Sequence, residues 1–275
     1  MSTPSIAIYR EAFNLALGVG PQNPFSVSSL DVSNDDFLKL GGKKGQRWEW
    51  EHGGHTYAFR IVRARGTIAS AGIALKRYIG AAGRTGTFSA STKAVSTTAD
   101  TFTENEINDA LIITTGGTGP NQVRRIKEHD ASANATVTIS ERDYTHNAYE
   151  AIGSPEAWTT LPDATTTYSI YCGWEVVPTS GVGDVVIGVS LAAVTSGNWT
   201  IIIEGGPCQA LVVGSTDATT AGGHVVPSAT AGTLKGPTAA GITAVEAAGV
   251  CGQAIQVQAG AAALTAIILS RRHVV

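Results

Sequence analysis

Charged residues are scarce in this sequence. Asp, Glu, Lys and Arg make up 15% of its 275 residues, against about 25% in ordinary soluble domains. Glycine is frequent instead, with 32 residues. A surface with so little charge suits a protein that is covered by partners rather than one that stays alone in water. A chain of this length can bury about three quarters of the surface of its unfolded form, enough for one large β domain or two small ones.

Cysteine and long apolar runs are also scarce, and both absences exclude a class of protein. Cys172, Cys208 and Cys251 are odd in number and widely spaced, without a C-x-x-C pair or a histidine at zinc spacing. The pattern speaks against a disulfide framework and predicts buried, reduced thiols. No run of 18 apolar residues occurs, and no basic segment followed by an apolar one begins the chain. We therefore expect synthesis in a cytosol and no insertion into a membrane.

Charge of one sign is missing from long parts of the chain. Ten Lys or Arg and only two acids lie between Lys39 and Arg84, whereas no Lys or Arg and eight acids lie between Arg142 and Lys235. This division predicts that one part docks on an acidic surface and the other faces solvent. Binding to nucleic acid is a weaker alternative, since no nucleic-acid motif accompanies the basic residues. A solvated basic face without a partner is the strongest competitor.

Alternating apolar and polar residues predict β-strands through most of the chain. Residues 47–51 and 56–63 alternate on either side of Gly53 and Gly54, which is typical of a hairpin. The Thr103-x-x-Glu106 capping box predicts one short helix. Other strands are expected at 111–115, 123–126, 136–140, 165–171, 184–194, 199–204, 209–213 and 261–269, with turns at 116–121, 195–198 and 205–207. This pattern predicts an all-β fold, a β-barrel or β-sandwich with at most one or two short helices.

Changes in composition along the chain predict three parts. Residues 1–45 mix scattered apolar residues with Pro, Ser and Gly and are expected to form an extended N-terminal arm, with a short helix near residues 8–17. Residues 46–180 form a β-rich domain in this interpretation. Residues 181–275 are more apolar and are expected to form a C-terminal β-barrel-like domain. No exact internal repeat is seen.

No residue pattern predicts catalysis, a cofactor or a metal. The Gly116–Gly119 loop lacks the Gly-Lys-Ser/Thr of a phosphate loop. Glu51, His52 and His55 do not form an H-E-x-x-H motif and fall on the Gly-Gly hairpin, which fixes no ligand geometry. No G-x-S-x-G elbow occurs, and no nucleophile lies beside the remaining histidines, His129, His146, His224 and His273. We therefore assign no catalytic, cofactor-binding or metal-binding residue.

Three stretches resemble the structural proteins that accompany the major capsid protein in tailed bacteriophages. The first is WEWEHGGHTYAFRIVRA at 48–64, similar to the strand, glycine turn and second strand that open phage decoration proteins. The second combines GGTGPNQVRRI at 116–126 with WTTLPDATTTYSI at 158–170. The third covers 187–213 and 222–269, where Gly-flanked apolar strands precede a small-residue turn and a final Ala-rich strand. These patterns identify a class rather than one protein, because each consists of turn residues and apolar strands.

The resemblance implies a capsid decoration or cement protein and not an enzyme. It implies a homo-oligomer, expected to be a homotrimer, on the outer surface of the virion's capsid. The major capsid protein is then the partner, synthesis takes place in the host bacterial cytoplasm, and neither nucleic acid nor membrane is bound directly. We expect the arm and the basic stretch 39–84 to bind acidic patches of the shell, and the apolar strands after Gly181 to pack the barrel and its self-association.

Two other functions remain open from the sequence. The first is a head or tail fibre module that binds host surface glycans through tryptophans. The second is a polysaccharide-degrading tail enzyme, which would need paired carboxylates in a cleft. The tryptophans concerned are Trp48, Trp50, Trp158, Trp174 and Trp199.

Overall fold

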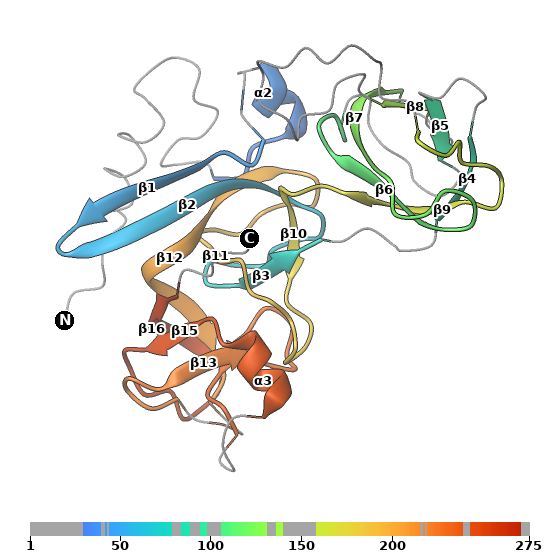
Figure 1. The fold of residues 1–275 in the computed structure, drawn as a ribbon. Helices are drawn as coiled ribbons and strands as arrows, with labels where there is room; N and C mark the ends of the chain where they lie inside the picture. Colours follow the sequence, from blue (N-terminus) through green and yellow to red (C-terminus); the bar gives the residue numbers. More distant parts are fainter. Residues whose placement is uncertain are drawn as a thin grey trace. The chain divides into compact units, whose positions relative to one another are not determined.

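The computed structural model divides the chain into two compact units, both built from strands (Figure 1). It describes residues 30–39, 42, 44–78, 84–88, 94–97, 106–130, 136–139, 158–214, 217, 219–238 and 243–270. Unit 1 comprises residues 1–77 and 174–275, and unit 2 comprises residues 78–173. The expected all-β fold class is confirmed. The division differs from the expected domains 46–180 and 181–275, because strands from before residue 77 and after residue 174 pair in one sheet.

Unit 1 begins with the hairpin that the alternating residues predict. β1 (Arg47–His52) pairs antiparallel with β2 (His55–Ala64), in the register that places Arg47 opposite Arg60 and His52 opposite His55. Gly53 and Gly54 form the two-residue turn, with φ values of +59° and +77°. Two successive positive φ values are those of a hairpin turn that matches the strand twist, and they require glycine or a similarly permissive residue.

A closed ring of five paired strands follows in unit 1. β2 pairs with β10 (Glu175–Pro178) in parallel, β10 with β3 (Ala74–Arg77), β3 with β11 (Gly188–Ser190), β11 with β12 (Trp199–Val212), and β12 with β2. The interior of this first barrel is apolar. Its buried side chains are Val62, Ala64, Ile68, Ile73, Leu75, Val176, Val194 and Ile202.

A second ring is built on the far half of β12. β12 pairs with β14 (Leu234–Lys235) in parallel, β14 with β13 (His224–Pro227), β13 with β15 (Gly252–Ala254), β15 with β16 (Ala263–Leu269), and β16 with β12. β12 therefore runs through both barrels, as Figure 1 shows. The turn expected at 205–207 is wrong, because the strand continues there through a register shift between Ile203 and Gly205.

The two barrels have the same topology in the same register. β2, β3, β10, β11 and β12 of the first correspond in order to β12, β13, β14, β15 and β16 of the second, each with one parallel pair. Val189 pairs with Ile203 as Gln253 pairs with Ile268. An isolated bridge also recurs four residues after the fourth strand of each barrel. Unit 1 is thus an internal duplication in which one strand serves both copies.

Glycines occupy the same places in both copies. Gly72 and Gly222 each lie two residues before the second strand of their barrel, with φ of +81° and +77°. Gly188 and Gly252 begin the fourth strands, where a side chain would strike the carbonyl oxygens of Ile203 and Ile268, respectively. The same close approach of backbones is therefore needed twice, and it explains why glycine stands at both positions.

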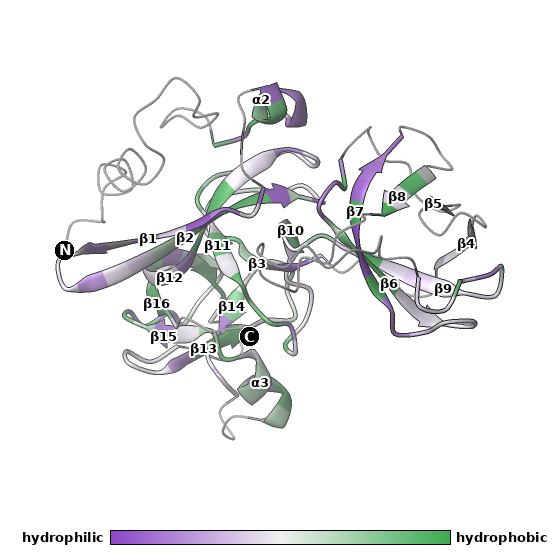
Figure 2. Ribbon diagram, turned by 45° about the horizontal axis from the view of Figure 1, so that its top comes forward, coloured by the Kyte–Doolittle hydropathy of each residue, from purple (hydrophilic) through white to green (hydrophobic). Residues whose placement is uncertain are grey.

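Unit 2 is a closed antiparallel barrel. Its strand order is β4-β5-β8-β7-β6-β9. The strands are β4 (Arg84–Phe88), β5 (Ala94–Thr97), β6 (Leu111–Gly116), β7 (Val123–His129), β8 (Thr136–Ile139) and β9 (Thr167–Tyr171). Ile112, Ile126, Ile139 and Tyr168 are completely buried within it. β7 turns charged side chains outward and is hydrophilic over most of its length (Figure 2).

Two short helices occur in the described residues, α2 (Asn34–Lys39) and α3 (Ala244–Gly249). The helix expected after Thr103 is wrong in the part that the structure describes. Residues 106–109 form a turn there, and Asp109 has a φ of +73° and donates its N–H to Ile126. Pairing with β7 outweighs helix formation, because the turn lets the Ala110 carbonyl accept the N–H of Ile126 on that strand. A complete capping box instead begins α3, between Thr243 and Glu246.

Residues 30–39 pack onto unit 1 and do not extend away from it. Val32 and Trp199 exchange two backbone hydrogen bonds of 3.0 and 2.8 Å. Phe37 of α2 is completely buried and stacks on Trp199, with ring centroids 4.1 Å apart. The expected extended arm is therefore wrong for these residues. The rest of the arm, including the helix expected near 8–17, lies outside the described residues.

Candidate interaction surface

Half of the basic residues in the stretch 39–84 are paired with three acids of the other charged stretch. Arg47 and Arg60 both contact Glu204, with Nε–O distances of 2.8 and 2.5 Å. Glu204 lies on β12, between the two barrels, and its side chain is only 8% exposed. Hydrophobic pairing of β2 with β12 brings these charges together. Residues of opposite sign that are distant in sequence are thus adjacent in the sheet.

Further ion pairs follow the same pattern in the first barrel. Arg63 and Arg65 approach the buried Glu175 at 3.4 and 3.7 Å. Lys76 contacts Asp184 at 2.9 Å. Burial opposes ionisation of Asp184, but hydrogen bonds from the Ser180 backbone and from Lys76 outweigh it and lower the pKa of that carboxyl. Five of the ten basic residues are therefore already paired, which removes much of the positive surface that the sequence suggested.

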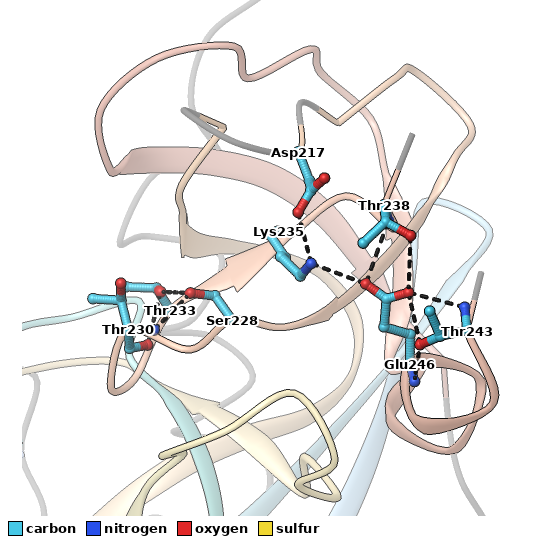
Figure 3. A network of polar contacts seen from close by, with 8 residues as sticks. All are labelled: Asp217, Ser228, Thr230, Thr233, Lys235, Thr238, Thr243 and Glu246. Atoms are coloured by element: carbon cyan, nitrogen blue, oxygen red, sulfur yellow. Dashed lines mark hydrogen bonds and ion pairs between the residues drawn. The ribbon is translucent and has the colours of Figure 1, made fainter. Parts of the chain in front are cut away.

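A buried polar network fastens α3 to the second barrel (Figure 3). The Lys235 ammonium donates to Asp217 at 2.7 Å and to Glu246 at 2.9 Å. Glu246, 2% exposed, also accepts from the backbone N–H and hydroxyl of Thr243. The Thr243 backbone and Lys235 together hold the pKa of Glu246 at about 2. Because its polar groups are satisfied within the protein, the network serves structure rather than chemistry.

An apolar strip remains exposed on the outer face of β16 and on the segment that follows β15. It consists of Ile255, Val257, Leu264 and Ile268, which are between 36% and 63% exposed, and we name it the β15–β16 strip. Leu264 and Ile268 alternate with buried residues along β16, and the Ile255 N–H donates to Ala266 between them. No charged residue occurs from residue 247 to residue 270. Scattered apolar residues on a surface are ordinary, but a continuous uncharged strip is typical of a contact surface.

The chemical candidates considered from the sequence do not assemble into a site. Within the described residues, no group of three or more His, Cys, Asp or Glu is arranged to hold a metal ion. Glu51 and His55 are exposed at the hairpin tip, and the side chain of His52 lies outside the described residues. His129 is buried, and its Nε2 accepts the Ile107 N–H at 2.8 Å. Its role there is to terminate a backbone turn.

The Gly116–Gly119 loop is a structural turn of unit 2. A side chain at Gly117 would strike the Thr165 carbonyl, and φ is +71° there. Asp163 accepts hydrogen bonds from Thr118 and from the Thr165 hydroxyl and backbone, which lower the pKa of its carboxyl. These contacts tie two loops of one barrel together and leave no phosphate cradle.

The tryptophans do not form an exposed platform in the described part of the chain. Trp158, Trp174 and Trp199 are buried, at 5%, 8% and 0% exposed. Lys44 lies over Trp174 and Arg124 over Trp158, each 5.5 Å from the ring centroid. Trp48 is half-buried and stacks on Phe59, while the side chain of Trp50 lies outside the described residues. Carbohydrate stacking needs an open ring face, so this arrangement disfavours a glycan site on these residues.

The three cysteines are free and buried, as predicted. Burial raises the pKa of the Cys208 thiol, which keeps it protonated and unreactive. Among the helices that the structure describes, none has the length and apolarity needed to cross a bilayer.

Comparison of the chain with protein-family models, with curated proteins and with solved structures gives no match. The β15–β16 strip is thus identified from its own geometry. Sequence reasoning located the apolar strands after Gly181 but not which of their faces is open. The run from 247 to 270, which has no charged residue, was the feature of the sequence that could have indicated an open apolar face.

Proposed function

We propose that the chain is a structural virion protein that binds the outer surface of a phage capsid and stabilises the shell. The observation that carries the proposal is the β15–β16 strip, an uncharged apolar contact surface on a barrel whose buried polar groups are used internally. A protein that reinforces a shell acts by burying area between subunits, and this needs no reacting group. The resemblance to decoration proteins supports the same assignment.

Attachment to the shell is assigned to a smaller part of the chain than the sequence suggested. Ion pairs with Glu175, Asp184 and Glu204 occupy much of the basic stretch. Residues 30–39 are held on unit 1 through Val32 and Phe37. In this proposal residues 1–29 make the contact with the major capsid protein, and unit 1 forms a homo-oligomer, expected to be a trimer.

Gold-labelled antibodies against the chain test the function on purified tailed-phage particles from cells that make it. Label over the heads is expected. Label on tails or fibres would instead favour the glycan-binding fibre module, and particles without label would refute a virion protein. A second arm adds purified chain to empty expanded heads. Deletion of residues 2–29 is expected to abolish the binding while the circular dichroism spectrum keeps its β signature, and unchanged binding would refute the assigned attachment.

A further inference from the structure

The internal duplication of unit 1 allows the β15–β16 strip to be compared with the same face of the first barrel. Trp199, Ile201 and Ile203 of the first barrel correspond in register to Leu264, Ala266 and Ile268 of the second. Both sets face outward, because Ile202 and Ile267 between them face the barrel interiors. The outward residues of the first barrel are nevertheless completely buried, whereas Leu264 is 50% exposed. One face therefore occurs twice in the chain, covered once and open once.

Trp199, the first of these outward residues, is covered by a segment of the chain itself. Val32 adds an antiparallel bridge at the start of β12, and Phe37 lies flat on Trp199 with an interplanar angle of 8°. Asn34 accepts the indole N–H of Trp199 at 2.9 Å. In the described residues Leu264 packs against Gly72 on one side, but no ring stacks on it and no added bridge lies beside Leu264 or Ile268. The second barrel thus presents a face whose counterpart is buried by protein contacts.

The chemistry of the strip selects its occupant. Without a charge between residues 247 and 270, the strip offers no group to attract an acidic or basic surface. For the same reason it meets no repulsion from a copy of itself. The four side chains are 36% to 63% exposed and form a patch on the order of a few hundred Å² per copy, the size of a functional surface patch. Two copies that bury it approach the roughly 1,000 Å² of the smallest specific interfaces.

We infer that a second copy of this chain covers the β15–β16 strip, so that strips of neighbouring copies meet at the symmetry axis of a homo-oligomer. The inference rests on the part of the proposed function that assigns the chain to protein–protein contacts. It names the surface and the partner, and it is independent of any capsid. Ile255, Val257, Leu264 and Ile268 become buried on assembly, as Trp199 and Ile203 are within the chain.

Light scattering of the full chain during size-exclusion chromatography tests the inference. The wild-type chain is expected at a multiple of 28.3 kDa at micromolar concentration. The double variant Val257→Lys, Leu264→Lys is expected at the monomer mass. Its dissociation constant should be at least about 100-fold higher, because two ammonium groups would be desolvated in the interface. Both side chains are at least half exposed in the single chain, so its circular dichroism spectrum should keep the β signature of the wild type, whereas the melting temperature should fall by the stabilisation that association supplies.

Val245→Lys is the matched control. Val245 lies on α3 of the same barrel, is 54% exposed and lies outside the strip, so this variant should keep the wild-type mass. A monomeric wild-type chain, an oligomeric double variant or an equally dissociated control would each overturn the inference. If deletion of residues 2–29 dissociates the chain while the double variant remains oligomeric, the inference is also overturned, and the contact between copies lies in that segment instead of the strip. None of these results depends on antibody labelling of phage heads, so the two proposals fail separately.

Discussion

Replacing Glu246 with Gln isolates the buried ion network of the second barrel. Gln keeps the size of the side chain and one carbonyl oxygen, but it removes the charge that faces Lys235 at 2.9 Å. Asp217 still accepts from Lys235 at 2.7 Å, so the ammonium is not left without a counter-ion. The variant therefore weakens the attachment of α3 without creating an unpaired buried cation, which would cost more.

The pKa of Glu246 sets the size and the pH range of the effect. Its pKa falls from 4.5 to about 2 on folding, which corresponds to about 3 kcal/mol. A lowered carboxyl pKa adds stability above pH 4.5, and this stability is lost as the pH falls through about 2. At pH 7 we expect Glu246→Gln to destabilise the second barrel by about 2–3 kcal/mol. At pH 3 less than about half of this difference should remain, because wild-type Glu246 is then losing its advantage.

Hydrogen exchange of the β15 and β16 amides measures the change within the second barrel. A loss of about 2–3 kcal/mol lowers their protection about 30- to 150-fold at pH 7, and the ratio should shrink at pH 3. Glu128→Gln, an exposed site on β7 of unit 2, is the control and should leave these amides unchanged. An equal loss of protection at both pH values would refute the electrostatic reasoning. So would a loss below about threefold at pH 7.

Three further predictions concern the duplication. In the first, unit 2 (residues 78–173) is replaced by a copy of Ser228–Thr233, the loop that makes the corresponding connection between β13 and β14. Unit 1 should still fold, and loss of its cooperative melting would show that unit 2 is needed. Phe37→Ala should destabilise unit 1 by about 3–5 kcal/mol and shift tryptophan fluorescence to the red as Trp199 meets water; an unshifted spectrum would contradict the covering role. Gly188→Ala should cost more than about 2 kcal/mol in urea unfolding, because its Cβ would lie 2.7 Å from the Ile203 carbonyl oxygen, and an unchanged midpoint would contradict that.

Local patterns predicted part of the strands and were insufficient to predict their partners. The strands that they missed are short: β3, β4, β5, β10, β13, β14 and β15. The hairpin of β1 and β2 followed from alternation around Gly53 and Gly54, since turn and register depend on adjacent residues. The turn expected at 205–207 failed for the opposite reason. Gly205 and Gly206 permit a bulge as readily as a turn, and pairing of the flanking residues with β2 and β16 decides between them.

The same limit explains the charges and the helices. Ion pairs such as Arg60 with Glu204 join residues far apart in the chain, so charge along the sequence was a poor guide to charge in space. The Thr-x-x-Glu motif occurs at Thr101, Thr103, Thr138 and Thr243, and in the described residues only the last is a complete capping box. A capping box favours a helix by about 1 kcal/mol, which strand pairing at Ala110 outweighs in unit 2.

The duplication escaped sequence inspection because it constrains backbone geometry more than side-chain identity. Gly72 and Gly222 supply the same positive φ, and Gly188 and Gly252 permit the same close strand approach. The outward positions have no such constraint, so Trp199 in one copy corresponds to Leu264 in the other. Where that outward face is covered from within the chain, aromatic stacking selects a large ring. Where it is to meet another molecule, smaller aliphatic side chains without charge suffice. The substitution of Trp199 by Leu264 thus falls at a position that is stacked in one copy and half exposed in the other, whereas Ile203 and Ile268 keep the same residue.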